Sequence, residues 1–166
     1  MNRPPQHNTA SSAEPVPYIE RTRQYYEAQG FQQAYRYAHN EQAPFSDLPK
    51  PLAQCTLGLV TTASTYARAS LEPRKVDSGS TDVTPKLYAD DLSWDKQATH
   101  LEDINSFCPL DALRTQVAAG RIGKLAPHFH CAPTEYSHRA TLDNDAPEIL
   151  RRLQADQVDI ALLIPL

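Results

Sequence analysis

A histidine with two acidic neighbours is the polar group of this sequence best suited to acid–base chemistry. His100 is followed closely by Glu102 and Asp103. A carboxylate beside a histidine holds the ring in one tautomer and favours its charged form, so the group can serve as acid, base or ligand. We take His100 and Asp103 as candidate catalytic residues. The alternative is a polar loop in which His100 caps the end of a strand or helix.

A second cluster of histidines could bind a metal. His128 and His130 alternate, so in an extended chain both would project to one side, as two ligands of a zinc or iron site must. Cys131 could join them, and His138 and Glu135 follow. The spacing matches no standard structural zinc module, however, and no second cysteine lies nearby. A surface cluster of hydrogen-bonded histidines is the alternative, and no cofactor is firmly implied.

Cysteine chemistry is represented by one candidate. Cys108 stands just before Pro109 at the start of an expected helix, where backbone N–H groups and the helix dipole lower the pKa of a thiol. It could therefore be a reactive, catalytic thiol. Its neighbour Phe107 and the apolar helix favour a packed, inert side chain instead. Cys55 begins an apolar strand and is expected in the core.

Hydroxyl and carboxylate groups supply candidate substrate contacts. Thr61 and Thr62 close an apolar run, at the strand end where open α/β sheets place their ligand crevice. They could bind a substrate carboxylate, whereas Asp90 and Asp91 could bind the ammonium group of an amino-acid-derived substrate. Turn formation by the threonines and ordinary solvation of the aspartates are the alternatives.

The elements that must position these groups alternate between strand and helix. Apolar runs without polar alternation predict buried parallel strands, and Pro at the start with Gly at the end predicts a helix. The expected strands are Cys55–Ala63 and Val158–Ile164, and the expected helices are Pro109–Gly120 and Ala146–Ala155. This pattern predicts a three-layer α/β fold with a mainly parallel sheet.

The remaining segments are assigned by their proline, glycine and aromatic content. Residues 1–17 are polar and rich in proline, which predicts a disordered arm ahead of a single α/β domain over 18–166. That domain begins with a helical lead-in whose aromatic stripe we expect to pack in a core, with Gly30 ending a first helix. Residues 64–98 are expected to form a long loop with short strands and a turn at Asp77–Ser80.

Composition excludes several classes of protein. With 166 residues and 40% hydrophobic content the chain has room for one compact domain, and its net charge of −4 argues against nucleic acid or an anionic membrane as partner. No apolar stretch approaches the roughly 20 residues of a membrane span, and the start has no secretory h-region. Three cysteines, an odd number, favour a reducing cytoplasm over a disulfide scaffold.

Three stretches carry a family resemblance. Leu57–Ala63 closes on Thr-Thr-Ala, and Val158–Pro165 is an apolar strand followed by proline. Thr99–Ala126 combines His, an acidic pair, Asn, Phe-x-Pro-hydrophobic-Asp-x-Leu and then Gly-x-Ile-Gly. Together they resemble the glycine/sarcosine/betaine reductase selenoprotein B family, which includes D-proline reductase subunits, over roughly Tyr18 to Leu166. The segment Pro127–Pro133 departs from the family, whose members carry an aromatic-rich stretch there.

The resemblance implies an oxidoreductase component of amino-acid metabolism. In the family, selenocysteine or cysteine follows the last strand, and its selenolate attacks a small amine substrate before thiols reduce the oxidised selenium. This chain ends at Leu166, before that position, so selenocysteine is absent from it. We expect either a reading frame stopped at a selenocysteine UGA codon or a natural short paralogue without the redox half.

Two further functions remain open at this point. One is a non-catalytic accessory or small-ligand-binding subunit, and the other is a metal-dependent enzyme using the histidines. A final strand with open edges also predicts self-association or a partner subunit.

Overall fold

The computed structural model describes residues 17–33, 38–43, 46–67, 75–89, 101–133 and 137–165. The chain divides into two compact units, Met1–Ala43 and Pro44–Leu166. Residues 1–16 of the predicted arm lie outside the described part. In that part, no helix combines the length and the apolar character needed to cross a membrane.

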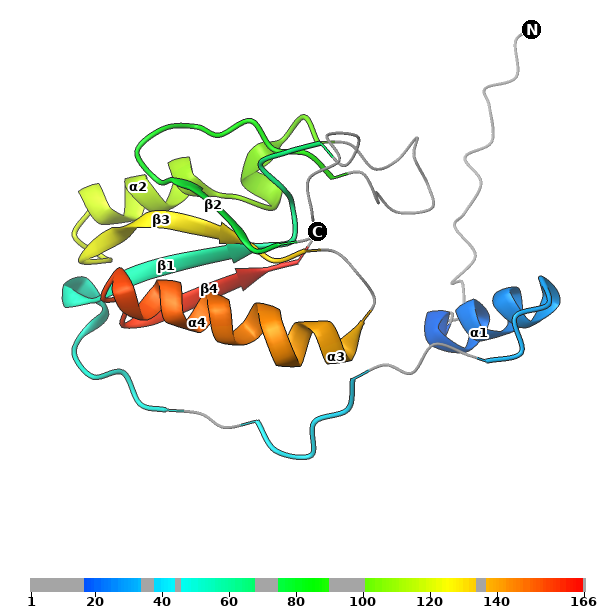
Figure 1. Ribbon diagram of the computed structural model, residues 1–166. Helices are drawn as coiled ribbons and strands as arrows, with labels where there is room; N and C mark the ends of the chain where they lie inside the picture. Colours follow the sequence, from blue (N-terminus) through cyan, green and yellow to red (C-terminus); the bar gives the residue numbers. More distant parts are fainter. Residues whose placement is uncertain are drawn as a thin grey trace, which may run out of the picture. The chain divides into compact units, whose positions relative to one another are not determined.

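The described part of the first unit contains helix α1, Tyr18–Ala28 (Figure 1). The helix ends where Gly30 adopts a φ of +89°, as predicted. The aromatic stripe behaves differently from the prediction, because Tyr25 and Phe31 are more than half exposed. Their rings make edge-to-face contacts with Tyr26, at 5.8 Å between centroids in each pair, rather than filling a core of this unit.

The second unit contains a four-stranded sheet. Its strands are β1 (Thr56–Thr61), β2 (Asp77–Ser80), β3 (Lys124–Cys131) and β4 (Ile160–Ile164), and their order across the sheet is β2-β3-β1-β4. β3, β1 and β4 run parallel, and β2 runs antiparallel to β3. The predicted mainly parallel α/β fold is therefore confirmed for this unit.

Helices pack on opposite faces of this sheet (Figure 1). Helix α2 (Leu110–Ala118) buries Leu110 and Leu113 in the cluster that contains Leu57 and Leu59 of β1. Helix α4 (Ala146–Ala155) lies against the other face, where Leu153 would be 2.7 Å from a Cβ on Gly58. Because β1 lies between two strands and two helices, all six of its residues are buried.

The short helical segments lead into these elements. The 3-10 turns η1 (Leu52–Gln54) and η3 (Ile104–Ser106) precede β1 and α2. The turn α3 (His138–Ala140) continues through the π-helical segment η4 (Thr141–Asp145) into α4. The predicted helix Ala146–Ala155 matches α4 residue for residue.

β4 occupies an edge of the sheet, which differs from the prediction of a second buried strand. Its residues alternate between half-buried and exposed positions, and Leu163 is 67% exposed. The cause is the strand order, since β4 has a neighbouring strand on one side only among the described residues.

The predicted turn at Asp77–Ser80 is wrong, because these residues form β2. The strand exists because Gly79 lies under the ring of Phe129: a Cβ at Gly79 would be 2.5 Å from that ring. Without a side chain at this position, the buried ring packs directly on the backbone of β2.

Candidate functional site

The carboxyl end of β1 lies at a topological switch point, because the chain passes from β1 through β2 and α2 to β3 on one side and then returns past β1 to β4 on the other. Helix α2 covers one face of the sheet on the first path, and α4 covers the other face on the second (Figure 1). Ligands of open α/β sheets bind in the crevice that such diverging connections create. Thr61 and Thr62 close β1 at this point, and Cys131 ends β3 beside Thr61. Two of the predicted substrate residues therefore lie where the fold favours a ligand.

Thr61 links the strands that meet at this edge. It is paired with Cys131 on one side and with Ile164 on the other, and it is 1% exposed. Its side-chain oxygen accepts a hydrogen bond from the N–H of Ala63 at 3.3 Å, which turns the chain out of the strand. Thr62, half-buried, comes next at the edge. Thr61 thus shapes the turn and leaves Thr62 as the more accessible hydroxyl.

The loop after β1 is tied to a second loop that leads to the predicted ammonium ligands. The backbones of Ser64 and Tyr88 exchange two hydrogen bonds of 2.8 Å. Asp90 and Asp91 lie outside the described residues. The segment that precedes them is nevertheless held, through Tyr88, to Ser64, which lies two residues after Thr62.

The cysteines at this edge are held as thiols. Cys108 is 1% exposed, and burial raises its pKa to about 11, although Arg114 opposes this. Burial, together with the nearby Asp77 and Cys108, raises the pKa of Cys131 to about 12. The predicted effect of the helix start on Cys108 is therefore smaller than the cost of burying a thiolate. Both side chains have the surroundings of core residues rather than of nucleophiles.

The acidic group near His100 has a local structural role. Asp103 caps η3, and its carboxylate accepts a hydrogen bond of 3.1 Å from the N–H of Asn105. Glu102 is exposed. His100 lies outside the described residues, so the predicted His100–Asp103 constellation stays a prediction.

The predicted metal ligands do not converge. His128 and His130 share the α4 face of β3, as their spacing predicted, but Cys131 points to the opposite face. His128 binds Asp156, with its Nδ1 3.0 Å from a carboxylate oxygen, and His138 lies exposed on α3. In the described ranges, which exclude Glu135, no three His, Cys, Asp or Glu side chains are grouped to hold a metal ion.

His130 belongs instead to a buried hydrogen-bond chain. Arg152 of α4 donates to the Oγ of Ser78 at 2.7 Å, and that oxygen lies 2.8 Å from Nδ1 of His130. The Ser78 hydroxyl accepts from Arg152 and can either donate to Nδ1 or accept from it, depending on the tautomer of the ring. Nε2 is buried and has no hydrogen-bond partner.

Sequence reasoning missed the partners of both histidines. Ser78 lies in the segment predicted as a turn, and Arg152 and Asp156 lie at the end of the predicted helix Ala146–Ala155, for which no polar role was predicted. One available signal was the i, i+4 spacing of Glu148 and Arg152, whose ion pair of 2.7 Å orients the guanidinium.

Replacing His130 by glutamine is expected to make the free energy of unfolding depend less on pH below pH 6.5. Burial lowers the pKa of His130 below its ordinary value of 6.5. Arg152 and His128 lower this pKa further, whereas Asp156 and Glu148 raise it. Below pH 6.5 the His130 ring binds a proton more readily in the unfolded chain than in the folded one. The wild-type free energy of unfolding therefore decreases as the pH is lowered below 6.5. Urea unfolding from about pH 8 to about pH 5.5 measures the slope. Equal slopes for wild type and His130→Gln would contradict this assignment.

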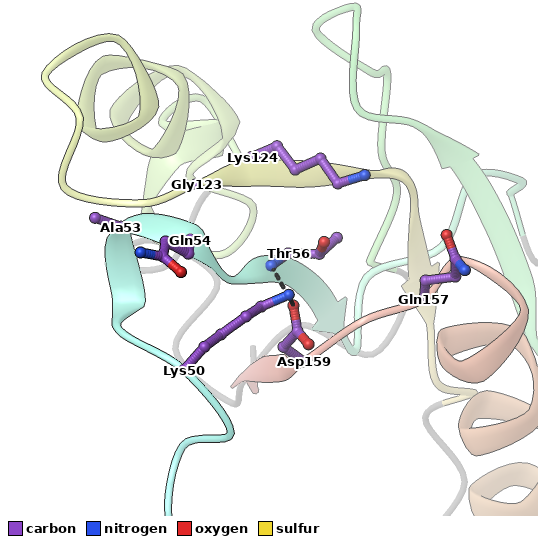
Figure 2. A pocket seen from close by; sticks show the side chains of 8 residues that line it. All are labelled: Lys50, Ala53, Gln54, Thr56, Gly123, Lys124, Gln157 and Asp159. Carbon is purple, nitrogen blue, oxygen red and sulfur yellow. Dashed lines mark hydrogen bonds and ion pairs between the residues drawn. The ribbon is translucent and has the colours of Figure 1, made fainter.

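An open polar hollow of about 560 Å³ lies at the other end of the parallel strands, where β1, β3 and β4 begin (Figure 2). Its main feature is Asp159, whose carboxylate accepts from Nζ of Lys50 and from the N–H of Thr56, each at 2.7 Å. The bond from Lys50, and then that from Thr56, lowers the pKa of Asp159. This arrangement fastens the start of β4 to the start of β1. The charges of Lys50 and Asp159 are thereby paired with each other, and the hollow lies away from the switch point.

The chain was compared with protein-family models, curated proteins and solved structures, and none of them matches it.

Proposed function

We propose that the chain is the N-terminal portion of a selenoprotein B-like oxidoreductase component, which reduces glycine-, sarcosine-, betaine- or proline-type small amines with thiol or disulfide electron donors. We also propose the three-layer α/β arrangement of that family and a cytoplasmic location, in keeping with three free thiols.

One observation carries the proposal: β1 and β4 are paired in register and end together. Thr61 lies opposite Ile164, so a residue delivered after β4 would emerge beside the hydroxyls of Thr61 and Thr62. The resemblance assigns the redox residue to that position. A nucleophile there and a carboxylate-binding hydroxyl next to it are what attack on an amino-acid-derived substrate requires.

The cysteines of the chain support the same reading. Cys55, Cys108 and Cys131 are all buried and free. With burial keeping Cys108 and Cys131 protonated, neither can replace a selenolate. In this proposal the redox group therefore comes from outside the described residues.

The nucleotide sequence after the Leu166 codon tests the redox half of the proposal. An in-frame UGA followed by cysteine-rich codons is the expected result. A UAA or UAG codon with no continuing frame would contradict it. That second outcome would favour a non-catalytic small-ligand-binding subunit, a function that the buried, protonated thiols also suit.

Replacing Thr62 by valine tests the substrate half. If the hydroxyl binds the substrate carboxylate, Thr62→Val is expected to weaken binding of glycine, sarcosine, betaine or D-proline about tenfold, the effect of losing a hydrogen bond to a charged group. Calorimetric titration measures this, and Thr62→Ser should restore affinity.

Thr115→Val is the matched control, because Thr115 is an exposed threonine on α2 whose hydroxyl binds only its own helix backbone in the described structure. Equal affinities for Thr62→Val and Thr115→Val would exclude Thr62 from the substrate site. Binding of none of the four amines would contradict the proposed substrate class.

A further inference from the structure

The outer edge of β4 has the properties of an interface. Among the described residues β4 pairs only with β1, and its five residues include neither a charge nor a proline. Soluble proteins normally protect such an edge with charged residues, prolines or bulges. On the α4 face of the strand, Ala161 is exposed and Leu163 is 67% exposed.

Hydrogen bonding elsewhere in the sheet shows which β4 backbone groups are available. The carbonyl of Thr61 accepts from the N–H of Ala132 after β3, so the odd-numbered residues of β1 point to β3 and Gly58 points to β4. Gly58 is the register partner of Ala161 and bonds in a parallel ladder to the two residues that flank it. The N–H and C=O groups of Ala161 and Leu163 therefore point outward.

These outward groups are complementary to a second copy of themselves. If two β4 strands run antiparallel about a twofold axis at Leu162, Ala161 lies opposite Leu163 of the other copy. All outward N–H and C=O groups of these two residues then pair. Shifting the axis to Leu163 would place Ala161 opposite Pro165, which has no N–H to donate. Of these two registers, only the one centred on Leu162 places Ala161 of each copy opposite Leu163 of the other, a small side chain against a large one.

An apolar flank of α4 extends the same surface. Arg152 reaches Ser78 of β2, so that side of α4 faces the β2 edge. Leu150 lies about 160° around the helix from Arg152, at 100° per residue, and therefore on the side toward β4. It is 56% exposed. Leu150 and Leu163 are thus two exposed leucines on the side of α4 and of the sheet that borders the open edge.

The geometry points to a symmetric dimer of this chain, formed by antiparallel pairing of β4 with β4 of a second copy, centred on Leu162. The two sheets join into one, and on the α4 face Leu163 of each copy lies opposite Ala161 of the other. This interface goes beyond the proposed reductase function.

Sedimentation of the full chain tests the dimer. The wild-type chain is expected to sediment as a dimer, and Leu163→Lys to weaken self-association at least about tenfold, since it places a charge opposite Ala161 of the other copy. Val83→Lys is the control: Val83 is 61% exposed and follows β2 at the other edge of the sheet. A wild-type monomer, or a dimer that Leu163→Lys leaves intact, would overturn the proposal.

Cross-linking tests the register. A mixture of Ala161→Cys chains with Leu163→Cys chains is expected to form a disulfide-linked dimer on oxidation, because facing residues of an antiparallel pair have the Cα separation that a disulfide requires. Each variant alone should remain mostly unlinked, and the native cysteines are buried and do not compete. Efficient linking of Ala161→Cys to itself, or no linking in the mixture, would overturn this register.

Discussion

Replacing Phe129 by alanine is expected to lower the free energy of unfolding by about 3–5 kcal/mol. The ring has no exposed surface, and its register partners are Leu59 of β1 and Gly79 of β2. Removing it leaves a cavity in the apolar cluster between the sheet and α2, which contains Leu59, Leu110 and Leu113. Because small proteins are stable by only about 5–15 kcal/mol, much of the folding free energy would be lost. Urea unfolding measures the change.

Phe31→Ala is the matched control for this substitution. Phe31 is 57% exposed, and in the described part of the chain its ring contacts that of Tyr26, so its loss should cost within about 0.5 kcal/mol. A Phe129→Ala change no larger than this would show that the ring is not a central support.

A double-mutant cycle identifies the partner of the ring. Gly79→Ala alone should destabilise by about 1–3 kcal/mol, because its Cβ would lie 2.5 Å from the Phe129 ring. In the Phe129→Ala background the same methyl group has room, and the cost should largely vanish. Additive effects of the two substitutions would contradict direct packing.

This dependence of β2 on a distant ring shows why some elements could not be predicted from the sequence. β1 and α4 carry their own signals, a continuous apolar run and a helical pattern with an early proline, and both were predicted within two residues of their ends. β2 is a short polar segment, Asp-Ser-Gly-Ser, whose strand form depends on Phe129 about 50 positions later. Local patterns contain no information about that contact.

The same limit applies to the position of β4 and to the histidines. An apolar run predicts a strand but not its place in the sheet, so β4 was expected to be buried and instead lies, half-exposed, at an edge. The alternation of His128 and His130 correctly predicted a shared face. Their partners, Asp156 and Ser78, come from other elements, and only the tertiary fold shows these contacts.

Replacing Gly123 by alanine is expected to cost about 3 kcal/mol, although the position is not in the core cluster. A Cβ there would lie 2.7 Å from the carbonyl oxygen of Cys55 and 2.7 Å from the carbonyl carbon of Gln54. These are backbone atoms, which cannot rotate away as a side chain does. The chain entering β3 would have to move from β1, stretching the bonds from Gly123 N–H to Leu52 and from Lys124 N–H to Cys55, each 3.1 Å.

Gly120→Ala separates this steric effect from an effect of backbone conformation. Gly120 has a φ of +69°, and nothing lies within 4 Å of an added Cβ, so alanine there should cost about 1 kcal/mol through strain alone. Gly120 and Gly123 are the two glycines of the Gly-x-Ile-Gly motif, and each has its own physical reason: the first ends a helix and the second lets two strands start in contact. Urea unfolding should rank Gly123→Ala well below Gly120→Ala in stability. The reverse order would mean that the start of β3 does not lie as close to β1 as this fold requires.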